Sequence, residues 1–355
     1  MNRIERRVIA VIALGSSACA APRGRAPLRS TEALSLSGEW DEPLAKLRTV
    51  SAALDRIGKR LPHLDSTIRR PRTGRGVSIY VFDGGVSDQH SELAGRVRRG
   101  FDAFPNGPRI CNPHGTAVAG AAAGATLGVA PDAEIVDVKI INCDHLRGSV
   151  SAILAAARWT VADHLHHPGQ PAVANWSFVV DTGRTVPEVD SAATLLHNAG
   201  IVVVVAAGNI ERDACRVSPA NTLNAIVVGA SALTHDATSA RTLRDVRAPN
   251  TAWGRCISLY APGDSVLLPG VERGTAIVAA WNGTSMAAGY TSGAAALILE
   301  RDQSASPERV AQTLVWSATP NVVDERRDAG SIARSRLLYI GPAERVIASA
   351  SRNRR

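Results

Sequence analysis

Four polar residues of this sequence stand in local settings that suit acyl-transfer chemistry: Asp83 after an aliphatic run, His114 before a small-residue run, Asn209 after Ala206–Gly208, and Ser285 before an Ala-rich run. Such chemistry needs a nucleophile, a base to take its proton, a group to hold the base, and donors for the oxyanion. Ser285, His114 and Asp83 are the candidates for the first three roles. Asn209 is the candidate for the fourth.

Ser285 lies between a turn and a predicted helix in the stretch NGTSMAA, which begins at Asn282. A serine at a helix N-terminus lies in the positive end of the helix dipole, and its own amide N–H is free to serve as an oxyanion donor. A serine in this place can equally be a simple N-cap. The local setting of Ser285 therefore leaves its role open.

The other three candidates are just as ambiguous singly. A histidine can present one ring nitrogen to a serine and the other to a carboxylate, but His114 could also be a solvent-facing or capping residue. Asp83 and Asn209 could each be turn residues. The order of the four along the chain decides the interpretation, because Asp, His and Ser follow one another as in subtilisin, whereas hydrolases with a nucleophile elbow place the serine first.

Strands and helices that alternate along the chain must position these residues. Apolar runs predict strands at 77–82, 133–141, 171–180, 201–206 and 225–229, and helices at 38–60, 149–165, 187–198, 285–300 and 307–317. Alternating strands and helices predict an α/β fold with a mostly parallel sheet covered by helices on both faces. In such sheets, functional residues gather beyond the carboxyl ends of the strands.

The composition supports a large buried core and gives no sign of a nucleic-acid partner. Hydrophobic residues make up 45% of the 355 residues and aromatic residues only 4%. The net charge is +8, but the arginines that carry it are scattered, without a basic stripe interleaved with aromatic residues. We therefore expect no nucleic acid as a partner.

The N-terminus predicts export from the cytoplasm. A short basic segment, an apolar run at 8–14 and small residues at 15–21 are typical of a signal peptide, which we place at 1–20. Two alternatives stay open for Cys19: acylation, as in a bacterial cell-envelope lipoprotein, or ordinary cleavage nearby followed by secretion. Beyond it we expect a short pro-segment or tether at 21–48, a catalytic domain at 49–341 and an Arg-rich tail at 342–355.

Four cysteines remain when Cys19 is set aside, and an even number in an exported protein predicts two disulfides. They are Cys111, Cys143, Cys215 and Cys256. The count and spacing alone allow three pairings.

With these motifs in hand, the sequence resembles the subtilases, and within them the proteinase K and aqualysin branch. The resemblance runs from about Leu54 to Tyr339. It is carried, in one order, by GRGVSIYVFDGGV around Asp83, CNPHGTAVAG around His114, AVANWS, VVAAGN ending at Asn209, DACRVSPAN, GRCISLYAPG, and NGTSMAAGY around Ser285.

This resemblance implies a three-layer subtilisin-like fold and a serine endopeptidase that acts through an acyl-enzyme, with Asn209 and the Ser285 amide in the oxyanion hole. It pairs Cys111 with Cys143 and Cys215 with Cys256. It also implies that an extended polypeptide substrate binds between two segments of a monomer. The implied substrate-binding residues are Gly148, Ser149, Ser177, Phe178, Val179, Ala207 and Gly208.

Several residues depart from the family pattern. Gly84 replaces a Thr or Ser after the catalytic Asp, Ala117 replaces a second histidine, and Gly289 replaces a proline that normally shapes the helix. The family has small glycines in the second substrate-binding segment, and Phe178, Val179 and Val180 stand there in this sequence. These departures keep one alternative open, a degenerate subtilase that binds peptides at the cell envelope without cleaving them.

No cofactor is expected for the chemistry. The family's calcium-binding Asp near Cys256 is replaced here by Ser258, which removes a hard oxygen ligand. We therefore do not expect calcium at that place, although structural calcium elsewhere stays open.

Overall fold

A computed structural model describes residues 47–48, 51–68, 72–180, 182–236, 239–272, 274–324 and 336–341. The signal peptide, Cys19 and the Arg-rich tail fall outside these residues, as does most of the segment at 21–48. Among the described residues, no helix has both the length and the apolar character that crossing a bilayer requires.

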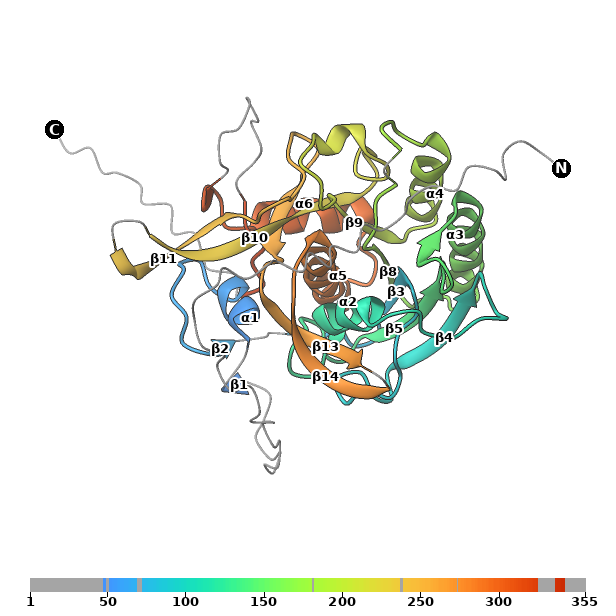
Figure 1. The fold of residues 1–355 in the computed structure, drawn as a ribbon, viewed down its shortest axis with the longest axis horizontal. Helices are drawn as coiled ribbons and strands as arrows, with labels where there is room; N and C mark the ends of the chain where they lie inside the picture. The colour runs from blue at the N-terminus through green and yellow to red at the C-terminus, as the bar shows by residue number, and fades with distance from the viewer. Residues whose placement is uncertain are drawn as a thin grey trace.

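A nine-stranded sheet forms the centre of the molecule (Figure 1). Its order is β15-β11-β10-β9-β8-β3-β5-β4, with β12 paired to β10. The strands are β3 (Ser78–Asp83), β4 (Val97–Asp102), β5 (Glu134–Lys139), β8 (Ala172–Trp176), β9 (Val202–Ala206), β10 (Ile226–Asp236), β11 (Ser239–Arg247), β12 (Leu259–Pro262) and β15 (Val323–Asp324). All pairs are parallel except β10 with β11.

Helices cover both faces of this sheet (Figure 1). The helices are α1 (Ala52–Ile57), α2 (His114–Ala123), α3 (Val150–Leu165), α4 (Pro187–Asn198), α5 (Thr284–Arg301) and α6 (Pro307–Ser317). Helices α2 and α5 pack together on one face, with α6 against α5, and helices α3 and α4 pack together on the other. The predicted three-layer α/β fold is confirmed.

Alternate side chains of the central strands enter two separate cores. In β3, Ile79 and Val81 pack toward α2 and α5, whereas Tyr80 and Phe82 pack toward α3 and α4. All four are essentially inaccessible to solvent. This burial on both faces explains why the strand reads as a continuous apolar run, as expected for a parallel sheet.

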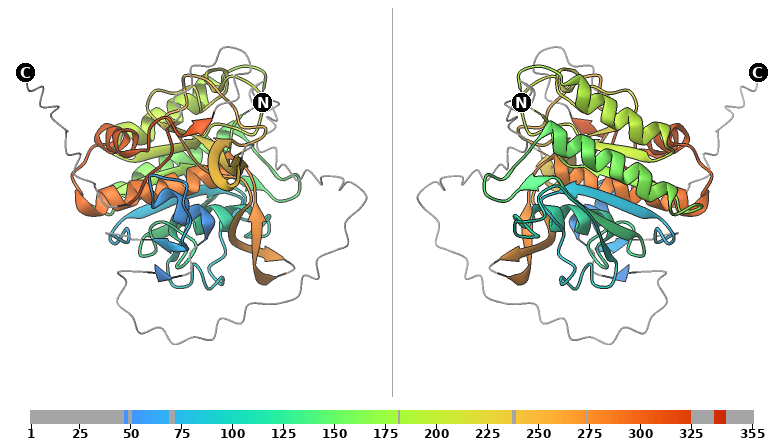
Figure 2. Two further views of the ribbon diagram at one scale, coloured as in Figure 1. Left: turned by 90° about the vertical axis from the view of Figure 1, so that its left-hand side faces the viewer. Right: turned by 90° about the vertical axis from the view of Figure 1, so that its right-hand side faces the viewer.

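Three short pairs of strands lie outside the sheet. They are β1 (Leu47–Arg48) with β2 (Thr67–Ile68), β6 (Ile141–Asn142) with β7 (Arg147–Gly148), and β13 (Val266–Glu272) with β14 (Thr275–Trp281). The hairpin β13–β14 projects from the body of the molecule, with β13 against α2 (Figure 2). The predicted helix at 38–60 is wrong in part: its described portion has a strand at 47–48 and a helix only at 52–57, because Leu47 and Arg48 pair with β2.

Candidate active site

Asp83 and His114 come together where β3 ends and α2 begins. Their side chains are buried, and the Nδ1–H of the imidazole donates to Oδ2 of the carboxylate at 2.7 Å. The second carboxylate oxygen, Oδ1, accepts the backbone N–H of Gly84 at 2.7 Å. Because Nδ1 carries the proton that faces Asp83, Nε2 of a neutral His114 keeps its lone pair and can act as a base.

Two opposing effects set the basicity of this histidine. Burial of the ring disfavours its protonation, whereas the negative charge of Asp83 and the hydrogen bond to it favour protonation. The attraction to Asp83 prevails, so the pKa of His114 lies above its usual value. A base with a raised pKa accepts a proton from a hydroxyl more readily.

The loop before His114 is fixed to the loop after Asp83. The backbone N–H of Cys111 donates to the carbonyl oxygen of Gly84 at 2.8 Å, and Asn112 Oδ1 accepts the N–H of His114 at 2.9 Å. A Cβ on Gly85, which has a φ of +106°, would lie 2.3 Å from the carbonyl oxygen of Arg109. A side chain at position 85 would therefore separate the two loops that carry the Asp–His pair.

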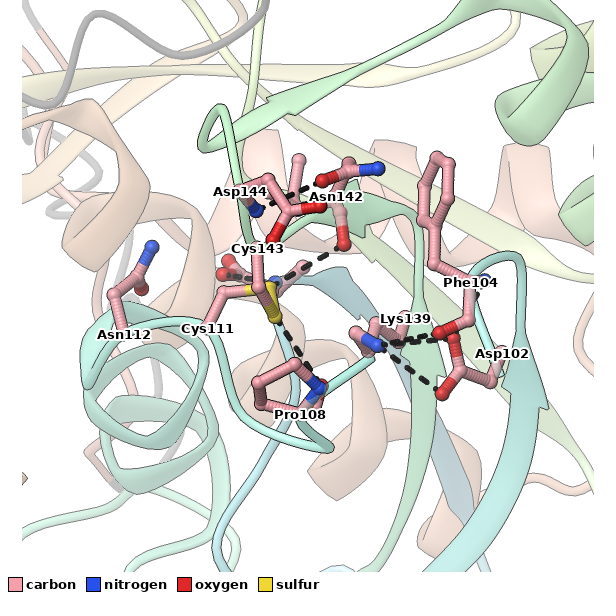
Figure 3. The surroundings of a disulfide bond; sticks show 12 residues. Asp102, Phe104, Pro108, Cys111, Asn112, Lys139, Asn142, Cys143 and Asp144 are labelled. Atoms are coloured by element: carbon pink, nitrogen blue, oxygen red, sulfur yellow. Dashed lines mark hydrogen bonds and ion pairs between the residues drawn. A yellow bond between two sulfur atoms is a disulfide. The ribbon is translucent and has the colours of Figure 1, made fainter. Parts of the chain in front are cut away.

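A disulfide joins Cys111 to Cys143, and Figure 3 shows it beside the ion pair of Lys139 with Asp102. A second disulfide joins Cys215 to Cys256. These are the pairs that the resemblance implied. The first disulfide ties the loop before His114 to the segment after β6. The start of α2 is therefore held both by this disulfide and by the hydrogen bond from the Cys111 N–H to the Gly84 carbonyl oxygen.

Ser285 is the second residue of α5, and its side chain is buried. Its hydroxyl donates to the carbonyl oxygen of Ser177 at 3.0 Å, while the Ser177 hydroxyl donates to the carbonyl oxygen of Ser285 at 3.1 Å. The end of β8 is thus bonded to the start of α5 in both directions. In this arrangement the hydroxyl proton of Ser285 faces the Ser177 carbonyl oxygen, so the hydroxyl must turn before another acceptor can receive that proton.

A buried polar chain holds Ser177 in place. Asn175 Nδ2 donates to the Ser177 hydroxyl at 2.7 Å, and the Ser292 hydroxyl donates to Asn175 Oδ1 at 2.9 Å. Asn175 and Ser292 are fully buried. Asn175 lies within the AVANWS motif, but sequence reasoning assigned no role to either residue. Satisfied buried networks of this kind rigidify a site.

The side chain of Asn209 is oriented by the start of α5. Its Oδ1 accepts the backbone N–H of Thr284 at 2.8 Å and the Thr284 hydroxyl at 3.0 Å. The Nδ2 group therefore points away from Thr284, and a Cβ on Gly283 would lie only 2.7 Å from it. Since α5 begins at Thr284, the amide of Ser285 has no acceptor within the helix. The side-chain amide of Asn209 and the backbone N–H of Ser285 thus both lie at the start of α5.

The two segments expected to bind substrate lie at the ends of different elements. Gly148 ends β7, and Ser149 caps α3 by accepting the N–H of Ala152 at 3.1 Å. Ser177, Phe178 and Val179 follow β8, and Ala207 and Gly208 follow β9. The ring of Phe178 is buried and stacked on Trp176 at 5.3 Å, so only its backbone is available to a peptide.

The indole of Trp281, at the end of β14, approaches the imidazole of His114 edge-on at 6.4 Å between centroids. Sequence reasoning missed this contact, although Trp281 directly precedes the NGTS motif. A large aromatic residue beside a motif of small residues was the available signal.

No group of three or more His, Cys, Asp or Glu side chains with metal-binding geometry occurs in the described ranges. The hydroxyl of Ser258 accepts the backbone N–H of Val227 at 3.1 Å. The Ser258 hydroxyl is thus engaged with the backbone of β10.

A model of the subtilase family matches residues 74–334. This chain belongs to the subtilase family. An extracellular serine proteinase of Thermus sp. (strain Rt41A) is 40% identical over 288 residues, which cover 81% of this chain and 65% of that protein. The alkaline serine exoprotease A of Vibrio alginolyticus is 34% identical over 81% of this chain and 49% of its own length.

The crystal structure of a cold-adapted subtilisin-like serine proteinase is similar with a TM-score of 0.70 and 31% identity, over 83% of this chain and 99% of that one. The chain spans between half and two thirds of the length of the two relatives named above. Both relatives are named as serine proteases, and the first as extracellular.

Proposed function

We propose that this subtilase is a serine endopeptidase that cleaves polypeptides bound in an extended conformation, with Ser285 as nucleophile, His114 as general base and Asp83 as the group that orients the base. The observation that carries the proposal is the 2.7 Å hydrogen bond between His114 Nδ1 and Asp83 Oδ2 at the start of α2. That helix packs against α5, which carries Ser285.

In the first step, the Ser285 hydroxyl turns from the Ser177 carbonyl to His114, and its oxygen attacks the scissile carbonyl carbon. The hydroxyl proton passes to His114 Nε2, while the carbonyl π electrons move onto its oxygen. Asn209 Nδ2 and the Ser285 N–H donate to that oxyanion, a contribution of roughly 3 kcal/mol for one donor. The imidazolium then protonates the leaving amine, and an acyl-enzyme remains on Ser285.

Deacylation repeats these steps with water as the nucleophile. His114 takes a proton from the water, the hydroxide attacks the acyl carbon, and the proton returns to Ser285 as the acid leaves. Every proton moves through His114, and no cofactor is required for this chemistry.

The test is labelling with a fluorophosphonate followed by mass mapping. We expect a single adduct on Ser285, abolished in Ser285→Ala, and hydrolysis of a casein substrate that falls about a million-fold in the same variant. Ser191→Ala serves as the control, because Ser191 is exposed on α4, which covers the opposite face of the sheet from α5. Absence of an adduct on folded protein, or an adduct elsewhere than Ser285, contradicts the proposal.

We also propose that the protein is exported through the signal peptide at 1–20, which the extracellular nature of the Thermus relative supports. Acylation of Cys19 would hold it at the cell envelope. Incorporation of labelled palmitate that Cys19→Ala abolishes supports the anchor, whereas an unlabelled protein in the culture medium shows ordinary secretion.

A further inference from the structure

A chain of hydrogen bonds inside the protein leads from Ser292 to the backbone of Ser285. The Ser292 hydroxyl donates to Asn175 Oδ1 at 2.9 Å, and Asn175 Nδ2 donates to the Ser177 hydroxyl at 2.7 Å. The Ser177 hydroxyl in turn donates to the carbonyl oxygen of Ser285 at 3.1 Å. All four side chains are buried. The chain therefore connects the interior of the fold with the residue proposed as the nucleophile.

The spacing of these residues places them where α5 packs against β8. Ser285 and Ser292 are seven positions apart on α5, about two helical turns, so they lie on one side of the helix. Asn175 lies on β8, and Ser177 directly follows the end of this strand. Because the two residues are two positions apart, their side chains point to the same face of the sheet. The four residues thus form a polar row beside the aliphatic core on this face.

The direction of the hydrogen bonds is set at Asn175. An amide oxygen accepts hydrogen bonds and an amide nitrogen donates them, so Nδ2 faces the Ser177 oxygen while Oδ1 needs a donor on its other side. Ser292 supplies that donor. Because the Ser177 oxygen accepts from Asn175, its single proton is free for the carbonyl oxygen of Ser285. With the amide turned round, Asn175 Oδ1 would compete for this proton.

Two hydrogen bonds join Ser177 to Ser285, and they have different fates in the proposed reaction. The bond from the Ser285 hydroxyl to the Ser177 carbonyl oxygen must break before the hydroxyl can attack. The bond from the Ser177 hydroxyl to the Ser285 carbonyl oxygen can persist. It holds the backbone of the residue whose N–H is proposed to stabilise the oxyanion. The position of the Ser285 backbone during the reaction therefore depends on a hydroxyl that Asn175 orients.

We propose that Ser292 is a positioning residue for Ser285 and acts through Asn175 and Ser177. The inference rests on the proposed function. Removal of the Ser292 hydroxyl leaves Asn175 Oδ1 without this donor in a fully buried place, which is unfavourable, so the amide is no longer held in one orientation. A displacement of reacting groups by about 1 Å can lower a rate by about 100-fold. Ser292 thus controls the reactivity of Ser285 from about two helical turns away.

The experiment is a double-mutant cycle between Ser292→Ala and Ser177→Ala. It measures the rate at which a small alkyl fluorophosphonate, which needs no bound peptide, modifies Ser285 per folded molecule, with the folded fraction taken from circular dichroism. We expect each single variant to lower this rate roughly 10-fold to 100-fold. Since Ser292 acts through the Ser177 hydroxyl, adding Ser292→Ala to Ser177→Ala should change the rate by less than about 2-fold. The pH midpoint of the rate should stay as in the wild type, because the chain of hydrogen bonds contains no ionisable group.

Thr291→Val is the matched control, because the Thr291 hydroxyl is also buried on α5 but bonds to the Ala287 carbonyl oxygen within its own helix. It should keep the wild-type rate. Ser292→Cys, whose thiol is a weak donor, repeats the test with a side chain of similar shape. Wild-type rates in the Ser292 variants, an equal loss with and without the Ser177 hydroxyl, or a shifted pH midpoint overturn this inference alone. A wild-type protein that is not modified at Ser285 overturns the proposed function and the inference with it.

Discussion

The imidazole of His114 and the carboxylate of Asp83 form a buried hydrogen bond of 2.7 Å between the first residue of α2 and the last residue of β3. Neither residue is exposed, so a positive charge on the His114 ring is balanced chiefly by Asp83. This relationship fixes the tautomer of the base and raises its pKa.

The raised pKa predicts where peptidase activity appears as the pH increases. His114 must be neutral to accept a proton, and its pKa lies above the ordinary value of 6.5. Activity should therefore be lost below neutral pH and rise through a midpoint above 6.5. The profile of kcat/KM against pH measures this midpoint, which reports on the free enzyme.

Replacing Asp83 by Asn removes the charge that raises this pKa. In Asp83→Asn we expect kcat to fall about 10⁴-fold, because the amide no longer fixes the required tautomer. The residual activity should rise at a lower pH than in the wild type, since burial alone disfavours the imidazolium. A midpoint that stays where it was in the wild type would count against Asp83 as the group that sets the basicity of His114.

A substitution at Asn209 can separate its hydrogen bonding to Thr284 from its proposed role as an oxyanion donor. Asn209→Asp keeps an oxygen that can accept from Thr284 N and Oγ1, but it removes the N–H donor and adds a negative charge beside the oxyanion. We expect kcat to fall 10² to 10³-fold or more with little change in KM. Thr284→Val, which removes only one of the two bonds that orient Asn209, should cost much less, and equal losses in both variants would refute the donor role.

The central strands and the helices at 150–165, 187–198 and 307–317 could be predicted from sequence because each carries its own periodicity or apolar run. Chain order and local motifs were enough to single out Asp83, His114, Asn209 and Ser285. What could not be predicted depends on contacts between distant segments. Strand β11 has no apolar run that distinguishes it from a loop, and the apolar run at 276–281 in β14 does not show which segment pairs with it.

The ring contact of Trp281 with His114 could not be predicted for the same reason, and neither could the hydrogen bond between Ser285 and Ser177. Each joins residues that are more than 100 positions apart. Sequence periodicity reports which face of an element is buried, but not which distant element covers it.

Gly289, which replaces a proline of the family pattern, is another residue whose role depends on its contact with a distant segment. A Cβ there would lie 2.8 Å from the carbonyl oxygen of Val118 and 2.9 Å from Cβ of Ala121. A Cβ on Gly293, one turn later, would likewise lie only 2.4 Å from the carbonyl oxygen of Ala122. The two glycines allow α5 to approach α2 closely, and the first turns of these helices carry Ser285 and His114.

Gly289→Ala should therefore destabilise the fold and disturb the site, although alanine is the better helix former. Overpacking of this kind costs about 1–3 kcal/mol, and kcat should fall with it because the two helices are pushed apart. Urea unfolding and kcat measure the two effects. Gly107→Ala is the control, since a Cβ there meets nothing closer than 3.6 Å, and stabilisation in Gly289→Ala would refute the close-packing role.

The raised pKa of Asp137 predicts that the free energy of unfolding depends on pH independently of the Asp83–His114 pair. It lies on β5, with its Oδ1 accepting the N–H of Val86 at 3.2 Å and its Oδ2 3.3 Å from Arg109 Nη2. Burial, reinforced by the negative charges of Asp83 and Asp102, raises its pKa to about 7, and Lys139 opposes the shift. The attraction of Arg109 across 3.3 Å does not outweigh the loss of hydration.

The sign of the effect follows from proton linkage. Between the ordinary aspartate pKa of 3.8 and about 7, the folded protein holds a proton on Asp137 that the unfolded chain has released. The contribution of this group to the free energy of unfolding therefore decreases as the pH rises through that window and is constant above it. Asp137→Asn cannot ionise, so it should gain stability relative to the wild type as the pH is raised from 4 to 8.

Urea unfolding of both proteins at several pH values measures that difference directly. Asp88→Asn is the matched control, because Asp88 is more exposed and its pKa is lowered, first by a hydrogen bond from Gln89. In that variant the difference from the wild type should be nearly flat between pH 4 and 8, since an aspartate with a lowered pKa loses its contribution only as the pH falls below its unfolded pKa of 3.8. A difference for Asp137→Asn that is flat between pH 4 and 8 would show that the buried carboxylate ionises normally, held in its charged form by Arg109 and the Val86 amide.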